Sequence, residues 1–232
     1  MKKVGYLLVL LTGLFYACTE TEEINDTVTG KTFYPLSIGD YRIYNVTDVR
    51  YQSDTVLSSD TFQLRERVDT VFTNLAGEPT YKIIRSKRNK SADQWRDDSV
   101  ITVTVSSSQV RRHADNLSQV KMVFPVSENK TWNPNVYNTQ EPGNARYVNV
   151  NQPYAVNNQN FNKTATVVVN DFISIINKDV RTEVYAENVG MIYKDYEVLQ
   201  YCNDDQLCKV GEDYIMFGYH RIEALESYGK MP

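Results

Sequence analysis

Apolar and polar side chains alternate with a period of two residues along most of this 232-residue chain. In the segment 61–73, Phe62, Leu64 and Val68 share one face, while amide and charged side chains occupy the other. This period predicts β-strands, because successive side chains of a strand point to opposite faces. The same pattern predicts further strands over residues 80–85, 95–105, 120–126, 164–169, 180–186, 191–200, 214–220 and 221–228.

The predicted fold is an all-β domain built on an antiparallel sheet, with little helix. The chain shows no long apolar stripe with the 3.6-residue period of a helix, and its 17 tyrosines suit pleated, half-buried surfaces. A sandwich, a barrel and a curved open sheet all remain open. We expect one domain over residues 32–232.

Residues 133–162 interrupt the alternation. Ten of the twenty asparagines of the chain fall within these thirty positions, together with Pro134, Pro142 and Pro153. These residue types favour turns, so the segment is interpreted as a long Asn-rich loop. A loop of this length is usually functional or disordered.

Three positions are predicted to adopt a left-handed or otherwise restricted backbone. The segment 34–42 aligns weakly with 124–132, and the alignment places Gly39 opposite Asn129. Glycine and asparagine are the residues that most readily take a positive φ. Gly190 is expected at a bulge or a strand entry, where a side chain would clash.

The N-terminus has the layout of an export signal. Lys2 and Lys3 precede an almost wholly apolar run from Val4 to Tyr16, and Ala17 is a small residue at the expected cleavage point. The run is too short to span a bilayer as a helix. Residues 1–17 are therefore predicted to be a signal peptide.

Cys18 follows directly, and this arrangement resembles the lipobox of bacterial lipoproteins, in which that cysteine is acylated after cleavage. The resemblance implies that lipidated Cys18 anchors the protein to a membrane, since two or more acyl chains anchor stably. The alternative is an ordinary secretory peptide with an incidental cysteine. Residues 18–31 contain four acidic residues and little apolar bulk, so a flexible tether is expected there.

The acidic residues after Cys18 also resemble the surface-export signal of Bacteroidota lipoproteins. Two further segments, 33–44 (FYPLSIGDYRIY) and 185–193 (YAENVGMIY), resemble landmarks of small exported lipoproteins of that phylum. Arg42 stands where the family pattern has a tryptophan. These resemblances imply a β-rich lipoprotein at the outer membrane, exposed on the cell surface or alternatively facing the periplasm, and they bring no catalytic residues.

The charge of the chain argues against a nucleic-acid partner. Removing residues 1–17 leaves 215 residues with 23 basic and 29 acidic side chains, a net charge of −6. Nucleic-acid binding depends on neutralising phosphates with clustered basic residues. The two basic concentrations, 87–96 and Arg111–Arg112, are interpreted as solvated strand ends.

After lipidation of Cys18, Cys202 and Cys208 form an even pair in an oxidising compartment. Asn203, Asp204 and Asp205 between them favour a turn, so a disulfide is expected. A metal pair is the alternative, although five residues between two thiols without a nearby histidine is poor zinc spacing.

The sequence offers little catalytic chemistry. His113 and His220 are the two histidines, and the chain contains no nucleophile elbow, phosphate-binding glycine loop or His-Glu-x-x-His motif. We expect a non-catalytic protein without a cofactor or a metal ion. An envelope hydrolase is the less favoured alternative.

The leading hypothesis is a lipid-anchored β-domain that binds an envelope protein or a glycan. The Asn-rich segment supplies candidate stacking faces and amide groups at Tyr137, Tyr147, Tyr154, Phe161, Asn135, Asn138 and Asn158. The alternative for this segment is a solvated irregular loop. A second hypothesis is a carrier that holds a lipid or another apolar ligand in a curved sheet, which requires a cavity of at least about 300 Å³.

Overall fold

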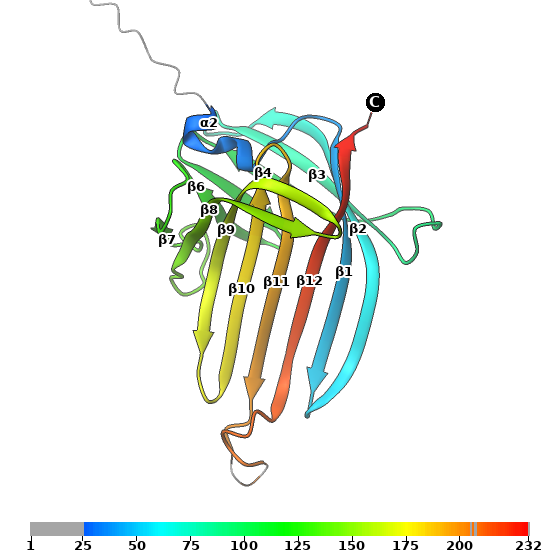
Figure 1. The fold of residues 1–232 in the computed structure, drawn as a ribbon, viewed down its shortest axis with the longest axis vertical. Helices are drawn as coiled ribbons and strands as arrows, with labels where there is room; N and C mark the ends of the chain where they lie inside the picture. The colour runs from blue at the N-terminus through cyan, green and yellow to red at the C-terminus, as the bar shows by residue number, and fades with distance from the viewer. Residues whose placement is uncertain (1–25, 205, 207, 232) are drawn as a thin grey trace, which may run out of the picture.

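The structure of the protein is a computed structural model that describes residues 26–204, 206 and 208–231. Its twelve strands form one sheet in the order β6-β5-β4-β3-β2-β1-β12-β11-β10-β9-β8-β7, and every neighbouring pair is antiparallel (Figure 1). This confirms the predicted fold class. The strands are β1 Asp40–Gln52, β2 Thr55–Thr73, β3 Pro79–Arg88, β4 Arg96–Val105, β5 Gln109–Ala114, β6 Leu117–Val123, β7 Thr131–Trp132, β8 Ala145–Val156, β9 Gln159–Ile173, β10 Asn177–Ala186, β11 Gly190–Tyr201 and β12 Ile215–Lys230.

Helical structure in the described residues is limited to the four-residue helix α2 (Asp26–Thr29) and the 3₁₀ turn η2 (Lys31–Phe33). Both lie at the end of the molecule where β1 begins (Figure 1). The backbone N–H of Val126 donates to the carbonyl of Thr29, which ties this segment to the sheet. The prediction of a flexible tether over 18–31 is therefore wrong for residues 26–31, because backbone hydrogen bonds hold them; residues 18–25 lie outside the described part.

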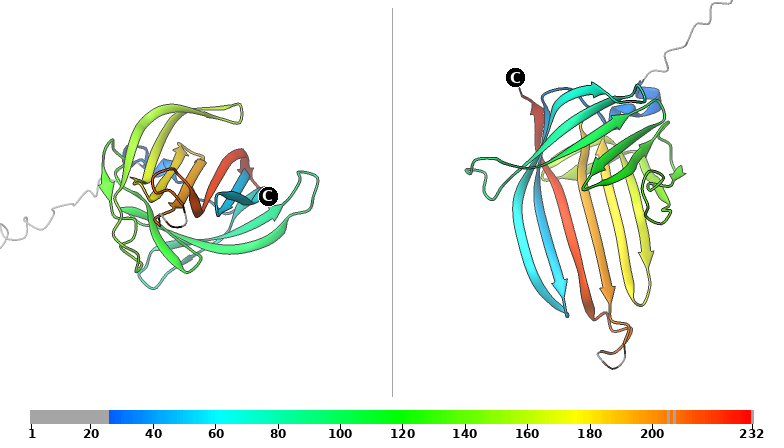
Figure 2. Two further views of the ribbon diagram at one scale, coloured as in Figure 1. Left: turned by 90° about the horizontal axis from the view of Figure 1, so that it is seen from below. Right: turned by 180° about the vertical axis from the view of Figure 1, so that it is seen from behind.

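The sheet has two parts, which we call the body and the blade. In the body, the sheet curls so that β3–β6, drawn in teal to green, cross over the upper halves of β9–β12 (Figure 2). The two ends of the sheet meet there: the indole N–H of Trp132 donates to the carbonyl of Val120, and the N–H of Val120 donates to the carbonyl of Pro134. The result is a nearly closed, barrel-like body with its core inside.

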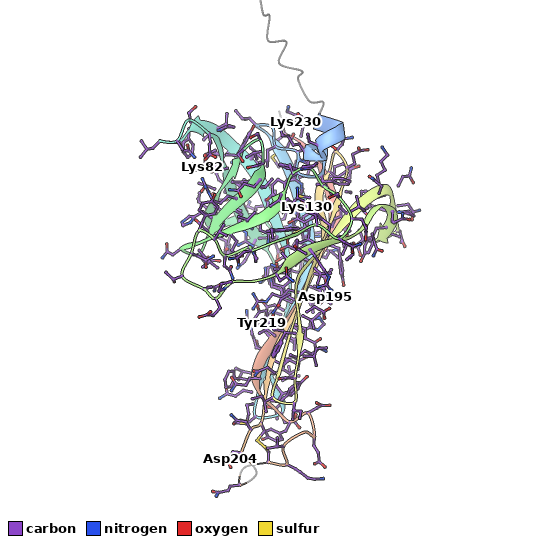
Figure 3. The ribbon with its side chains drawn as sticks, turned by 90° about the vertical axis from the view of Figure 1, so that its left-hand side faces the viewer. Lys82, Lys130, Asp195, Asp204, Tyr219 and Lys230 are labelled. Atoms are coloured by element: carbon purple, nitrogen blue, oxygen red, sulfur yellow. A yellow bond between two sulfur atoms is a disulfide. The ribbon has the colours of Figure 1, made fainter. Side chains whose placement is uncertain are left out.

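The blade is the remaining single layer, made of residues 49–62, 168–182, 196–201 and 215–221 from β1, β2 and β9–β12 (Figure 3). Of these residues, Leu199 alone is buried, since water reaches both faces of the layer. In the body, by contrast, the largest fully buried side chains gather in one core, led by Tyr44, Tyr147, Tyr185, Leu64, Ile83 and Met122.

Two predicted boundaries are wrong. Residues 145–156 and 159–162 are strand rather than loop, so the irregular part of the Asn-rich segment is confined to 133–144. Asparagine accepts the positive φ of a β-bulge as readily as that of a turn, and composition does not separate the two. The two strands predicted over 214–228 are one, β12, because it runs through both the blade and the body.

The predicted backbone positions are confirmed. Gly39, Asn129 and Gly190 have φ of 88°, 61° and 95°. The two segments that resemble lipoprotein landmarks also meet in space: Arg42 donates to the carbonyl of Val189 at 2.5 Å and to that of Pro35 at 2.7 Å. Arg42 thus joins the two segments at a buried seam.

Candidate functional site

The β8–β9 hairpin folds over the outer face of the sheet and forms what we call the strap, residues 149–164 (Figure 1). Its ladder is irregular, with register shifts between Val148 and Gln152 and between Gln152 and Tyr154. Such bulges bend a strand away from the plane of its sheet. At the tip, the side-chain amides of Asn157 and Gln159 donate to β12 carbonyls at 3.0 Å, which fixes the strap across the sheet.

A carboxylate supports the strap at its root. Glu128 accepts the backbone N–H groups of Asn149 and Val150 at 3.2 and 2.8 Å. Asn149 and Asn151 both have positive φ, at 54° and 59°. The asparagines and Glu128 together set the bend that lifts the strap off the sheet.

Between the strap and the outer face of β9–β11 lies an open groove of about 590 Å³. Its floor consists of threonine and valine side chains from β9 and β10. Tyr154 of the strap faces Tyr193 of β11, with ring centroids 5.9 Å apart and planes inclined by 38°. The polar groups that line the groove are Asn149, Gln152, Asp195 and Glu197.

The two groove carboxylates are both engaged. Asp195 Oδ1 lies 2.8 Å from Nε2 of His220, and the Tyr193 hydroxyl donates to Asp195 Oδ2 at 3.4 Å. Glu197 pairs with Lys178 at 2.5 Å. Burial and then the Asp195 charge raise the pKa of Tyr193 to about 12, so its hydroxyl stays protonated at neutral pH. The groove therefore presents hydroxyl, amide and carboxylate groups beside two aromatic rings.

A second cavity, of about 230 Å³, lies inside the body and is lined by charged side chains. Three glutamates that are almost fully buried, Glu66, Glu183 and Glu223, each pair with at least one cation from another strand. The pairs are Glu66 with Arg85 and Arg112, Glu183 with Lys121, and Glu223 with Lys194 and Arg221. This volume is below about 300 Å³ and the lining is charged, so this cavity does not suit the apolar ligand of the carrier hypothesis.

The Lys121–Glu183 pair joins β6 to β10 across the body at 2.5 Å. Glu183 also accepts hydrogen bonds from the hydroxyls of Tyr185 and Tyr196. Burial raises the pKa of Glu183, but the Lys121 charge and these hydrogen bonds outweigh it and lower the pKa to about 2. Because its partners are satisfied within the body, this cluster acts as a structural connection rather than as a ligand site.

The aromatic candidates predicted from sequence are dispersed. Tyr154 alone among them lies in the groove. Tyr147 is fully buried, and its hydroxyl exchanges hydrogen bonds with the backbone of Val123. Phe161 packs against Tyr228, and Tyr137 lies outside the groove, where it contacts Arg111.

The candidate asparagines either form hydrogen bonds to backbone carbonyls or occupy a turn. Asn135 donates to the carbonyl of Glu141 and Asn138 to that of Ser118, which holds the 133–144 loop. Asn158 occupies the turn of the strap with a φ of 61°. These amides are therefore not gathered toward a ligand.

The other predicted positions have mixed outcomes. Cys202 and Cys208 form the predicted disulfide at the far end of the blade. Cys18 and the signal peptide lie outside the described residues. His113 is exposed and hydrogen-bonded to Ser118, whereas His220 contacts the groove through Asp195.

Sequence reasoning missed Tyr193, Asp195 and Glu197. The sequence did contain a sign of them. The three residues occupy every second position of one predicted strand, so their side chains share one face of that strand. That face is polar, whereas a strand face that packs on a core is apolar. What sequence did not supply was the strap that covers them.

Two absences hold for the described residues. Three or more histidine, cysteine, aspartate or glutamate side chains never gather there in a geometry that would hold a metal ion. Among the same residues, none of the helices has the length and apolarity needed to cross a membrane.

Comparison with known proteins gives only distant likenesses. No protein-family model matches the chain, and no curated protein matches its sequence. A solved Bacteroides fragilis protein, described as exported and as having a YmcC-like fold, is similar over 85% of this chain and 99% of its own, with 12% identity and a TM-score of 0.45. A Parabacteroides distasonis protein described as a lipoprotein is similar over 85% and 98%, with 10% identity and a TM-score of 0.41.

Proposed function

We propose that this protein is a non-catalytic lipoprotein of the bacterial outer membrane, anchored through Cys18 and displayed on the cell surface, that binds a neutral saccharide in the groove beneath the strap. The anchor and the location rest on the signal segment and the acidic residues that follow it. The ligand class rests on the groove.

The observation that carries the ligand class is the combination of Tyr154 and Tyr193 with polar groups in one open groove. Aromatic rings offer flat apolar faces to the C–H groups of a sugar. The amides of Asn149 and Gln152 supply both donors and acceptors for its hydroxyls, and the Tyr193 hydroxyl, whose proton is directed at Asp195, adds an acceptor.

The two groove carboxylates, Asp195 and Glu197, both have partners within the protein. This favours a neutral ligand and binding without catalysis. Asp195 is held by His220 and Tyr193, and Glu197 by Lys178. An acid–base mechanism would need a carboxyl group free to exchange a proton with the substrate. An anionic ligand, in turn, would meet two carboxylates.

The test is an array of neutral and acidic oligosaccharides, followed by calorimetry with the neutral oligosaccharide that binds most tightly. Tyr154→Ala and Tyr193→Ala are each expected to weaken binding about tenfold, because each removes one stacking face. Tyr137→Ala is the matched control, since Tyr137 is an exposed tyrosine outside the groove.

Binding that survives both groove substitutions, or that is lost in Tyr137→Ala, would contradict the site. Capture of a peptide or protein by the groove, with no saccharide bound, would instead assign the groove to a protein partner. Turnover of a bound oligosaccharide would overturn the non-catalytic part of the proposal.

A further inference from the structure

A second polar site lies at the base of the β3–β4 hairpin, on the outer face of the sheet and on different strands from the groove. The guanidinium carbons of Arg65 and Arg88 lie 4.7 and 4.2 Å from the ring centroid of Trp95. Gln63 of β2 pairs with Arg88 of β3, so Arg65, two residues along β2, is on the same face. Two cations therefore contact one indole ring.

Neither arginine forms an ion pair with a carboxylate in the described part of the chain. Arg88 donates to the amide oxygen of Gln63 at 2.8 Å, and Arg65 donates to the Ser86 hydroxyl at 3.4 Å. The Nε of Arg65 is buried and has no hydrogen-bond partner among the described residues. The positive charge of Arg65 beside Trp95 is therefore not neutralised by a carboxylate in direct contact.

The nearby carboxylates are directed elsewhere. Asp97 accepts the Ser86 hydroxyl at 2.8 Å, and Asp98 pairs with Lys87 at 2.7 Å. Asp93, at the hairpin, accepts the backbone N–H of Lys90 at 3.0 Å. Arg65 and Arg88 therefore lie next to each other without a carboxylate of the described residues in contact with either of them.

Burial and then the charge of Arg67 lower the pKa of Arg65, and the charge of Arg88 lowers it further, whereas Asp97 raises it. The positive charges of Arg65 and Arg88 thus repel each other. An anion bound near both guanidinium groups would offset this repulsion. A planar guanidinium can also donate to two oxygens of a carboxylate or a sulfate at once.

Beside the cluster lies a hollow of about 440 Å³. Arg88, Trp95 and Arg96 line it together with the amides of Asn89 and Gln94, and Lys87 and Asp93 complete it. This volume exceeds what a single inorganic ion fills. The amides are suited to hydroxyl groups beside the charge.

We propose that Arg88 and Trp95 form a binding site for the carboxylate or sulfate of an acidic saccharide, with the amides of Asn89 and Gln94 contacting its hydroxyls and the charge of Arg65, which contacts the same indole ring, adding to the attraction. The basic stretch 87–96, interpreted from sequence as a solvated strand end, then has a specific role. This site is separate from the groove beneath the strap, and its ligand would be anionic, whereas the saccharide proposed for the groove is neutral.

The test is titration of the folded protein with glucuronate, glucose and inorganic sulfate, followed by calorimetry and by tryptophan fluorescence. Saturable glucuronate binding with a change in fluorescence is expected, because Trp95 lies at the site. Arg88→Gln is expected to weaken it about tenfold or more, since it removes a charge-assisted contact, and Arg65→Gln is expected to weaken it less, since it removes only a nearby positive charge. Arg146→Gln, which removes one positive charge from β8 near Asp171, is the matched control and should bind normally.

Thermal melting establishes that each variant is folded, and Arg88→Lys, which keeps the charge, should retain part of the affinity. Absence of saturable glucuronate binding would overturn the proposal, as would equal weakening by Arg146→Gln. Binding of sulfate without glucuronate would mean an adventitious ion only. Because these probes and variants do not involve Tyr154 or Tyr193, failure here leaves the neutral-saccharide groove unaffected.

Discussion

Arg42 and Gly190 depend on each other at the seam between β1 and β11. The Arg42 side chain is buried and donates to two backbone carbonyls. A Cβ at position 190 would lie 2.6 Å from Nε of Arg42, and Gly190 has a φ of 95°. Glycine is therefore needed for two reasons: the backbone conformation and the space for the guanidinium. Arg42 thus stabilises the seam by satisfying two backbone carbonyls, those of Val189 and Pro35.

Gly190→Ala is expected to destabilise the protein by about 1–3 kcal/mol, because it adds backbone strain and displaces Arg42 from its carbonyl partners. Gly77→Ala is the matched control: Gly77 also has a positive φ, of 80°, but its Cβ would meet nothing within 4 Å. Urea denaturation measures both. Equal losses of unfolding free energy in the two variants would show that the contact with Arg42 adds nothing to the effect of backbone strain.

The buried Glu183 makes stability depend on pH. Its pKa is about 2 in the folded state against 4.5 as the ordinary value, so the carboxylate is stabilised by folding. This contribution is fully present above pH of about 4.5 and is lost as the pH falls toward 2. Lys121→Met leaves Glu183 buried without its cation, and a loss of about 3–5 kcal/mol is expected at pH 7.

The difference in unfolding free energy between wild type and Lys121→Met should become smaller as the pH falls from 5 to 2. Denaturant unfolding at several pH values measures this difference. Lys163→Met serves as the control, because its pair with Glu187 is largely exposed and should be worth less than about 1 kcal/mol. A difference that does not change with pH would contradict the role given to the Glu183 charge.

At the scale of elements, the blade has no second layer to protect it, and its far end is closed by the Cys202–Cys208 disulfide. In the chain-entropy model, a disulfide that closes a loop of this size stabilises the folded state by about 2 kcal/mol. Replacing both cysteines by serine should therefore lower the unfolding free energy by up to about 2 kcal/mol and raise amide exchange in β11 and β12 beside the loop. Unchanged exchange there would show that the blade end is ordered without the bond.

The period-two pattern predicted the strands of the body well, because their inward side chains meet a core. Leu64 and Val68, which the alternation places on one face, are both buried, whereas Val198, on the predicted strand 191–200, lies in the blade, where no layer covers it. Alternation shows which residues share a face and not what covers that face. The strap and the groove beneath it depend on bulges at asparagines, and the Arg65–Trp95–Arg88 cluster depends on pairing between β2 and the β3–β4 hairpin. Both are contacts that a linear pattern does not contain.

The whole molecule is elongated, and its two ends differ in their distance from Cys18, the expected lipid anchor. Helix α2 begins at Asp26, eight residues after Cys18, and eight residues span at most about 28 Å. The disulfide loop lies at the opposite end, beyond the blade (Figure 1). If Cys18 is acylated, the end of the body that carries α2 faces the bilayer and the blade points away from it.

This orientation is tested with acylated protein in vesicles that contain an acceptor-labelled lipid. A donor dye on Ile38→Cys, in the body, should transfer energy more efficiently than the same dye on Leu57→Cys, in the blade, because both positions are exposed but differ in their distance from α2. Fatty-acid labelling should disappear in Cys18→Ser, which should also stay in solution and show no transfer. Equal transfer from the two positions would contradict a blade directed away from the membrane, and labelling that survives in Cys18→Ser would contradict the anchor itself.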